Sequence, residues 1–460
     1  MRCISHNRMG VNSGKHHSRW LPAVLTILAT AVVVAAGAQN ALVAKELKAD
    51  VNRAAGMAYA LPVTMKGIKD TPVPGGKQPF YINHYGCPSS SYLPETQDYE
   101  QPYATFARAD SLGKLTSLGR DVLRRLDLIR QDARDRAGEL SAKGARQSRA
   151  IMRQLVERFP EAFTEKGYYS GRSVVENRCI LTMEEALAQL SSMKQPLNIL
   201  GRATPRERRF MDPQDQELAA LSMDSLTRSC YERFVAQNTD DTRLMASLFS
   251  DQQYVAGYVD AAALSRQLFR LAGSLQHTDL EGKVRLYDLF TREEVWRHWR
   301  RQNAWNYINY GGCTLNGGTQ PYLQRATLRN MIHTGDSMLK RYTPLIHVRY
   351  TREPVVMALA SLMELDDCGV QTGNLDSLET LGWADYRIAP LGGSIVMIHY
   401  RSDRDDPDVL VKVLLNGREA RLPVETDCAP YYHWQDVKRY YLRKVYRYEN
   451  MRFNQTDQRR

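Results

Sequence analysis

The chain has 460 residues, of which 43% are hydrophobic and 25% are charged. A chain of this length buries a large core, and its composition excludes an intrinsically disordered protein and a membrane protein with many spans. Its net charge of +11 favours anionic ligands or surfaces, although charge alone does not distinguish phosphate esters, nucleic acids and lipid headgroups.

The first 38 residues have the pattern of an export signal. They contain four basic residues and no acidic one, and residues 21–38 form an uncharged, apolar stretch that ends in Ala-Gly-Ala. A basic start, an apolar centre and a small-residue end are typical of a secretory signal peptide that is cleaved. An uncleaved anchor is the alternative, because the stretch approaches membrane-spanning length. In both cases we expect an exported protein of the periplasm or cell envelope, with membrane contact only through this segment.

The first part of the remaining chain mixes helical and strand patterns. Residues 41–57 have helical spacing, and residues 79–82 predict a short buried strand that runs into a turn-rich segment over 83–94. Apolar residues recur at helical intervals over 115–129, and a further helix carries Ile151 and Leu155 and ends before Pro160.

The later part changes from helices to strands. Residues 183–340 are mostly helical in period, while 345–350 and 394–400 are β-branched and aromatic. Asn416-Gly417 is typical of a two-residue turn and predicts a hairpin between 409–415 and 418–424. This order predicts an α/β fold, in which a core sheet is flanked by helices and carries an inserted helical cap. The expected segments are the signal at 1–38, the core at 39–182 and 341–445, the cap at 183–340, and a polar tail at 446–460.

Six cysteines remain when Cys3 leaves with the signal. In an oxidising compartment they permit disulfides, and we expect at most one or two, in a pairing that sequence does not determine. The sequence has no Cys-x-x-Cys pair and no Cys/His cluster with zinc spacing, so no metal is expected. No cofactor is implied.

Tryptophan and arginine alternate over residues 296–301, with Trp305 close behind. Such a run is also found on nucleic-acid or membrane surfaces. We favour an amphipathic helix with its tryptophans inward and its arginines in solvent. Export makes nucleic acid an improbable partner.

Several segments, in conserved order along residues 45–436, carry a resemblance to a known family. They are Phe-Tyr-Ile-Asn-His-Tyr-Gly at 80–86, Gly-Glu-Leu-Ser-Ala-Lys-Gly-Ala-Arg-Gln at 138–147, Arg-Ser-Val-Val-Glu-Asn-Arg at 172–178, Leu-Asn-Gly-Gly at 315–318, Ile-Ala-Pro at 388–390 and Asp-Cys-Ala-Pro-Tyr-Tyr-His-Trp at 427–434. With them the chain resembles the histidine phosphatase superfamily, and within its histidine acid phosphatase branch the bacterial multiple inositol polyphosphate phosphatases, which are phytase-like.

The resemblance implies a covalent phosphatase mechanism. In that family the histidine of an Arg-His-Gly-x-Arg loop attacks phosphorus. The two loop arginines and a distal arginine hold the phosphoryl oxygens, and a late His-Asp pair supplies the proton for the leaving oxygen.

This sequence departs from the family pattern at most of those positions. Cys87 and Ser91 replace the two loop arginines, and Pro88, which has no nucleophilic atom, replaces the histidine. Arg352-Glu353 stands where the His-Asp pair belongs, and only Arg178 matches outright. Losing a nucleophile costs many orders of magnitude in rate where catalytic residues act as a unit. We therefore expect an inactive or strongly impaired phosphatase.

The individual site residues keep alternative interpretations. Cys87 is a replacement nucleophile or, as we favour, a disulfide partner or inert thiol. His84 lines the pocket or is structural. Arg178 and Arg172, around a helix start, face an anion or form ordinary surface ion pairs, and Arg352 holds phosphate or pairs with Glu353.

Three functions remain open from the sequence. The first is an exported, inactive protein that binds a phosphorylated or other anionic ligand through Arg178, Arg172, Arg352 or His84. The second is an active phosphomonoesterase on inositol polyphosphates. The third is an envelope scaffold or interaction protein; the oligomeric state is not indicated.

Overall fold

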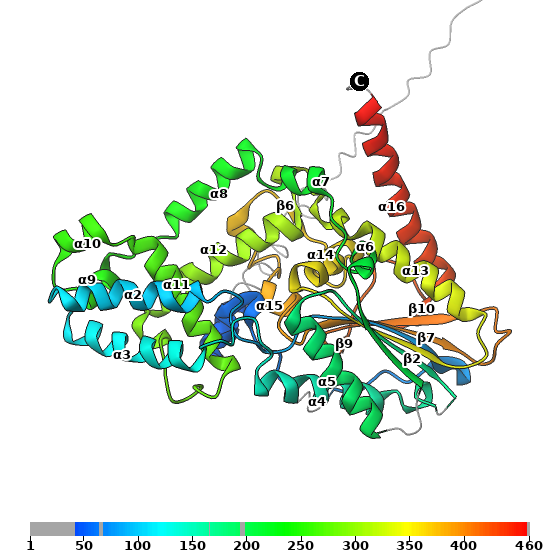
Figure 1. Ribbon diagram of the computed structural model, residues 1–460. Coiled ribbons are helices and arrows are strands. Elements are labelled where there is room, and N and C mark those ends of the chain that lie inside the picture. Colours follow the sequence, from blue (N-terminus) through cyan, green and yellow to red (C-terminus); the bar gives the residue numbers. More distant parts are fainter. Residues whose placement is uncertain (1–41, 64–67, 165, 194–197, 458–460) are drawn as a thin grey trace, which may run out of the picture.

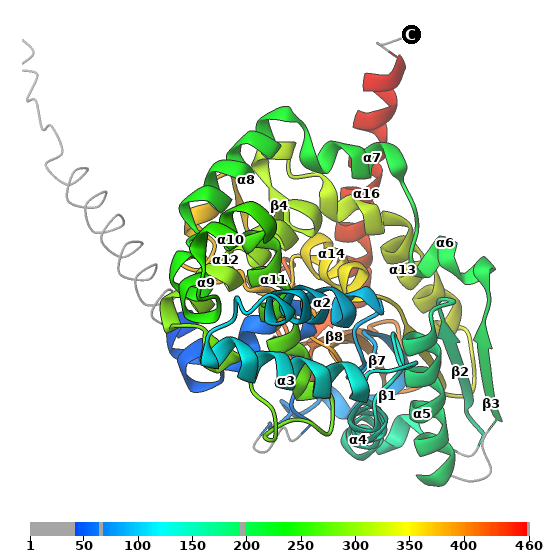
Figure 2. The ribbon, with the colours of Figure 1, turned by 60° about the vertical axis from the view of Figure 1, so that its left-hand side comes forward.

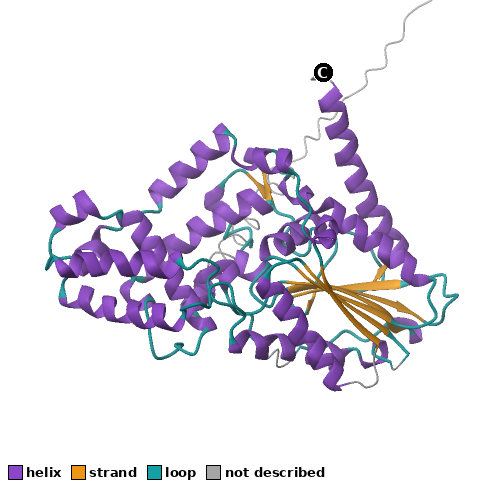
Figure 3. Ribbon diagram, in the orientation of Figure 1, coloured by secondary structure: helices purple, strands orange, loops and turns teal. Residues whose placement is uncertain are grey.

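The computed structural model describes residues 42–63, 68–164, 166–193 and 198–457. The expected signal at 1–38 lies outside the described residues. Within the described ranges, no helix combines the length and apolar character needed to cross a membrane. An α/β lobe built on one large sheet adjoins a lobe made of helices (Figures 1 and 3).

The main sheet has eight strands in the order β10-β8-β7-β1-β5-β2-β3, with β9 paired to β8. Strand β1 is central, because it pairs parallel with β5 on one side and antiparallel with β7 on the other. Its residues 79–86 are all buried, as expected for a strand covered on both faces. The strands are β1 Gln78–Gly86, β2 Tyr168–Ser173, β3 Asn198–Ala203, β5 Leu345–Tyr350, β7 Ser394–Arg401, β8 Leu410–Leu415, β9 Arg418–Glu419 and β10 Tyr432–His433; β4 Gly312–Cys313 and β6 Gln371–Thr372 form a separate pair.

The strand predictions are largely confirmed. Strand β5 has the predicted bounds, and Asn416 and Gly417, with φ of 51° and 77°, join β8 to β9 in the predicted hairpin. The second arm of that hairpin is shorter than predicted. Residues 83–86 are strand rather than turn, because backbone pairing with β5 and β7 continues to Gly86.

Helices cover both faces of the main sheet. In Figure 1, α4 and α5 lie below it, and α13, α14 and α16 lie above it. The helices of this lobe and its border are α4 Ala142–Arg158, α5 Asn177–Met193, α6 Arg208–Met211, α7 Gln216–Ala220, α8 Ser225–Gln237, α13 Arg325–Leu339, α14 Glu353–Met363, α15 Asp385–Ile388 and α16 Trp434–Asp457. Residues 446–457, expected as a polar tail, thus continue α16.

The helical lobe has its own hydrophobic core and is seen from its outer side in Figure 2. Its helices are α2 Gln97–Ser111, α3 Ser117–Asp132, α9 Thr242–Leu248, α10 Gln252–Tyr258, α11 Ala261–Ser274 and α12 Arg292–Tyr310. The lobe therefore draws on two separate stretches of chain. Helices α2 and α3 come from within the segment 39–182, and β3 and α13, which belong to the α/β lobe, come from within 183–340.

Helix α12 contains the tryptophan and arginine run. The prediction that its tryptophans point inward and its arginines lie in solvent is only partly correct. Trp299 is fully buried as expected, but Trp305 is 42% exposed. Arg301 was expected in solvent and is buried. Its guanidinium donates to Thr239 Oγ1 at 2.7 Å and contacts His298 Nδ1 at 2.6 Å, so the buried donors have partners.

Candidate functional site

Residues 87–91 leave the carboxyl end of β1 and form the loop that the sequence motifs predict at the centre of the site. All five are buried. Arg178, in the first turn of α5, and Glu353, the first residue of α14, lie beside this loop. The structure therefore brings together the residues that the sequence motifs predicted as one site.

The backbone N–H groups of the loop already have acceptors within the protein. Cys87 N donates to the Gly393 carbonyl at 2.8 Å. Ser89 N donates to Thr182 Oγ1 at 3.0 Å, and Ser90 N donates to the Gln147 side chain at 2.9 Å. Pro88 has no N–H to give. Residues 87–90 thus offer an anion no free backbone donor.

The loop is also held by close contact with the start of α4. Ser90 O accepts from the backbone N and the hydroxyl of Ser141, at 3.1 and 3.0 Å. A Cβ on Gly144 would lie 2.0 Å from that same Ser90 oxygen. Only glycine allows α4 to approach the loop this closely.

We expect Gly144→Ala to lower the free energy of unfolding by about 3 kcal/mol, because backbone atoms must move to relieve the clash. Gly257→Ala is the matched control. Gly257 also lies in a helix, and a Cβ there meets nothing within 4 Å, so that change is expected to stabilise by about 0.5–1 kcal/mol. Urea unfolding measures both, and equal effects would contradict the close packing of loop and helix.

Cys87 is not placed as a nucleophile. It is 1% exposed, and burial, together with the charge of Glu353, raises the pKa of its thiol well above the usual value. A thiol held protonated is a poor nucleophile. The six cysteines within the described ranges are all free, so no disulfide engages Cys87 there.

Arg178 is bound to carboxylates of the protein itself. Its two terminal nitrogens donate to the two oxygens of Glu353, at 2.5 and 3.0 Å, and its Nε donates to Glu176 at 2.5 Å. Burial alone would lower the pKa of Arg178, but the charges of Glu353 and Glu176 outweigh it and raise that pKa. The two guanidinium nitrogens that would bind phosphate oxygens bind a carboxylate instead.

The other two candidate arginines are paired as well. Arg352 donates to both oxygens of Asp212, at 2.9 and 2.8 Å, rather than to its neighbour Glu353. Arg172, on β2, donates to Glu207 at 3.1 Å. Each arginine predicted to hold an anion therefore has a carboxylate partner.

His84 is a structural residue in this arrangement. It is 2% exposed, packs against the ring of Tyr350, and has a pKa lowered to about 4 by burial, so it is neutral at pH 7. Together with Gly86 and Cys87 it borders a void that is too narrow for a water molecule. This void does not accommodate a phosphate group.

His277 also reaches the loop, and sequence reasoning did not find it. Its Nδ1 lies 3.3 Å from the hydroxyl of Ser90, which is 187 residues earlier in the chain. A serine beside a histidine is the start of a nucleophile–base pair. Here, however, both side chains are buried, and burial lowers the histidine's pKa to about 3. Such a weak base, closed off from solvent, is a poor activator of the serine hydroxyl.

No metal-ligating group gathers at this loop among the described residues. The described site therefore consists of internal ion pairs beside a loop that has Pro88 where the resemblance places a nucleophilic histidine.

Comparison with protein-family models gives no match, and comparison with curated proteins gives none either. Solved structures do match. The Bifidobacterium longum multiple inositol polyphosphate phosphatase in complex with inositol hexasulfate has a TM-score of 0.70 and 14% identity, covering 84% of this chain and 97% of that chain. The same protein in complex with phosphate has a TM-score of 0.69. The phytase from D. castellii has a TM-score of 0.62 and 13% identity, covering 86% of this chain and 85% of that chain. The expected histidine acid phosphatase fold is confirmed.

Proposed function

We propose that this chain is an exported protein with a histidine acid phosphatase fold that does not hydrolyse phosphate esters by the family's covalent mechanism. The observation that carries this proposal is the state of Arg178. It is the one residue that still matches the phosphate-gripping set, and Glu353 occupies both of its terminal nitrogens. Pro88 stands in place of the nucleophile, so the attack on phosphorus lacks its attacking atom. Arg178 is occupied by Glu353, so phosphate binding lacks its arginine.

An anionic ligand would have to compete with the protein's own carboxylates. The Bifidobacterium longum protein of this fold was solved in complex with phosphate and with inositol hexasulfate, whereas Arg172, Arg178 and Arg352 are each paired with a carboxylate here. We infer that the fold serves as a scaffold or interaction protein in the cell envelope, and that its former phosphate site is closed.

A phosphatase assay on the purified full chain tests the catalytic part of this proposal. With para-nitrophenyl phosphate and with phytate, we expect no turnover above the background of the Cys87→Ala and Glu353→Ala variants. Turnover by the unchanged chain that disappears in either variant would show a working site and overturn the proposal.

Calorimetric titration with inorganic phosphate tests the closed site separately. The unchanged chain is expected to show no saturable binding at neutral pH, because removing Glu353 from Arg178 costs more than a phosphate contact returns. Saturable binding that is lost in Arg178→Ala but kept in Arg172→Ala would instead support a retained anion pocket.

A further inference from the structure

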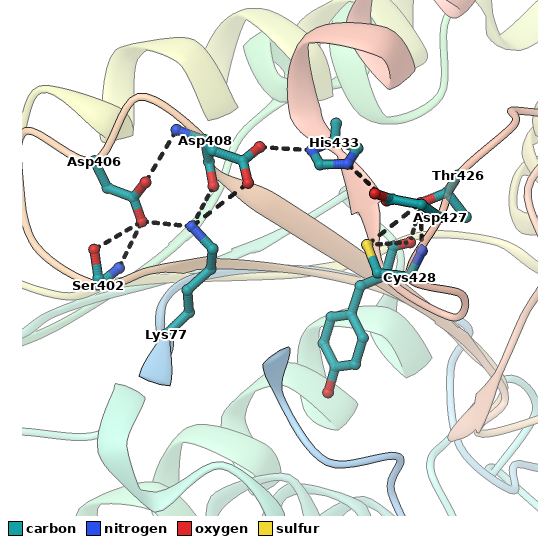
Figure 4. Close-up of polar contacts among 9 residues, drawn as sticks. Lys77, Ser402, Asp406, Asp408, Thr426, Asp427, Cys428 and His433 are labelled. Atoms are coloured by element: carbon teal, nitrogen blue, oxygen red, sulfur yellow. Dashed lines mark hydrogen bonds and ion pairs between the residues drawn. The ribbon is translucent and has the colours of Figure 1, made fainter. Parts of the chain in front are cut away.

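A second group of reactive side chains lies at the far edge of the sheet, on the loop that leads into β10 and α16. Asp427, Cys428 and His433 each offer one ligand atom, and these three atoms lie within 4.8 Å of one another (Figure 4). The group is separate from the loop at 87–91, and the proposed function makes no use of it.

The ring of His433 is held from both sides. Its Nε2 lies 3.0 Å from Asp427 Oδ1, and its Nδ1 lies 2.6 Å from Asp408 Oδ1 (Figure 4). With the Nδ1 proton accepted by the carboxylate behind the ring, Nε2 could bind a cation in place of the hydrogen bond that it makes to Asp427. This is the arrangement that positions histidine ligands in metal sites.

The three side chains stand on an ordered support. His433 pairs with Leu410 of β8, and the next residue, Trp434, starts α16 and donates its N–H to Val409 O at 2.9 Å. Tyr431 N donates to the Cys428 carbonyl at 2.9 Å, which closes the intervening loop. His433 is therefore placed by the sheet edge and the helix start, whereas Asp427 and Cys428 lie on the loop that this hydrogen bond closes.

The local charge favours a cation. Asp408 and Asp427 flank the histidine, and Lys77, which also approaches Asp408, is engaged by Asp406 at 2.7 Å. Lys77 Nζ remains 3.8 Å from Asp408 Oδ2 and contacts none of the three converging donors in the part of the chain that the structure describes. Asp427 is 81% exposed, so the site opens to solvent.

We propose that Asp427, Cys428 and His433 bind one zinc ion. Sulfur, imidazole nitrogen and carboxylate oxygen are the donors that zinc takes, and three protein ligands leave its fourth tetrahedral position to water. Calcium and magnesium, which take oxygen ligands, do not fit a set with a thiol and an imidazole. The ion would fasten the 427–433 loop to the start of α16.

Titration of the reduced full chain with Co²⁺, and competition with Zn²⁺, tests the proposal. We expect one metal per chain and a thiolate-to-cobalt charge-transfer absorption that Zn²⁺ removes. Cys428→Ser is expected to abolish that absorption, and His433→Gln to abolish stoichiometric binding. Asp408→Asn, which alters only the support behind the ring, is expected to weaken binding by about 10- to 100-fold.

Cys230→Ser is the matched control, because Cys230 is another partly exposed free cysteine outside the group; it should bind as the unchanged chain does. All of these positions lie at least partly in solvent, and circular dichroism checks that each variant is folded. Absence of the charge-transfer absorption from the unchanged chain would overturn the proposal, as would equal binding by the Cys428→Ser and Cys230→Ser variants.

Discussion

Replacing Glu353 by alanine is expected to lower the free energy of unfolding by about 3 kcal/mol, since the change leaves the buried Arg178 guanidinium with one carboxylate instead of two. The Glu353 side chain is 8% exposed and that of Arg178 is 17% exposed, so water does little to replace the lost partner. Glu176 remains in contact with Arg178, which keeps the expected loss near the lower end for a broken buried pair. Urea unfolding of the full chain measures it.

The comparison that isolates the pair is a double-mutant cycle. Arg178→Met combined with Glu353→Met removes both charges, and we expect this variant to lose less stability than the sum of the two single changes. Glu293→Ala is the control, because the Glu293–Arg297 pair is solvent-exposed and such pairs contribute about 0–1 kcal/mol. An effect of Glu353→Ala no larger than that of Glu293→Ala would contradict a closed, ion-paired site.

The fold has kept its core while the site has changed, and the two depend on different residues. Tyr81, Ile82 and Tyr85 on β1 are fully buried, and they hold the central strand whether or not the loop after it carries a nucleophile. The substituted positions contribute hydrogen-bonding and charged groups at the strand's end. Fold and chemistry are separable in this way because a site is carried by a few side chains on a scaffold.

The sequence predicted those parts of the structure that depend on local pattern. The β5 strand, with its β-branched and aromatic residues, and the Asn416-Gly417 hairpin follow from propensity and turn chemistry. The end of β1 was missed, because residues 83–86 read as turn-rich, whereas neighbours on both sides hold them in a sheet.

The partners at the site could not be predicted in the same way. Glu353 lies 175 residues from Arg178, and Asp212 lies 140 residues from Arg352. No spacing rule connects such positions, since the ion pairs depend on the sheet to bring together the segments that follow β2, β3 and β5. The motif comparison identified which residues occupy the site, but their mutual neutralisation is a property of the folded chain. The same holds for Asp408, which supports His433 from another strand end.

The largest expected effect concerns the phosphatase reaction that we propose this chain does not perform. The test compares two variants. The loop variant returns only the loop to the family pattern, with Cys87→Arg, Pro88→His, Ser89→Gly and Ser91→Arg. The full variant also returns the second half of the site, with Arg352→His and Glu353→Asp. The loop variant is expected to stay at background, because Glu353 still occupies both terminal nitrogens of Arg178 and the His-Asp pair that donates the proton in the family pattern is still missing. The full variant is expected to turn over para-nitrophenyl phosphate about 10³-fold faster than the loop variant, because it also carries the His-Asp pair that acts as general acid.

The control for the proton-donor pair carries only Arg352→His and Glu353→Asp. Its turnover should also stay at background, because catalytic residues that act as a unit give little rate enhancement when only some of them are present. A loop variant as active as the full variant would show that the Arg178–Glu353 pair does not close the site. A folded but inactive full variant would place the obstruction elsewhere, in the loop donors of Ser89 and Ser90 that Thr182 and Gln147 already engage. The two results distinguish the Arg178–Glu353 pair, which Glu353→Asp weakens by shortening the carboxylate side chain, from a loop held through its backbone, which side-chain substitution does not reposition.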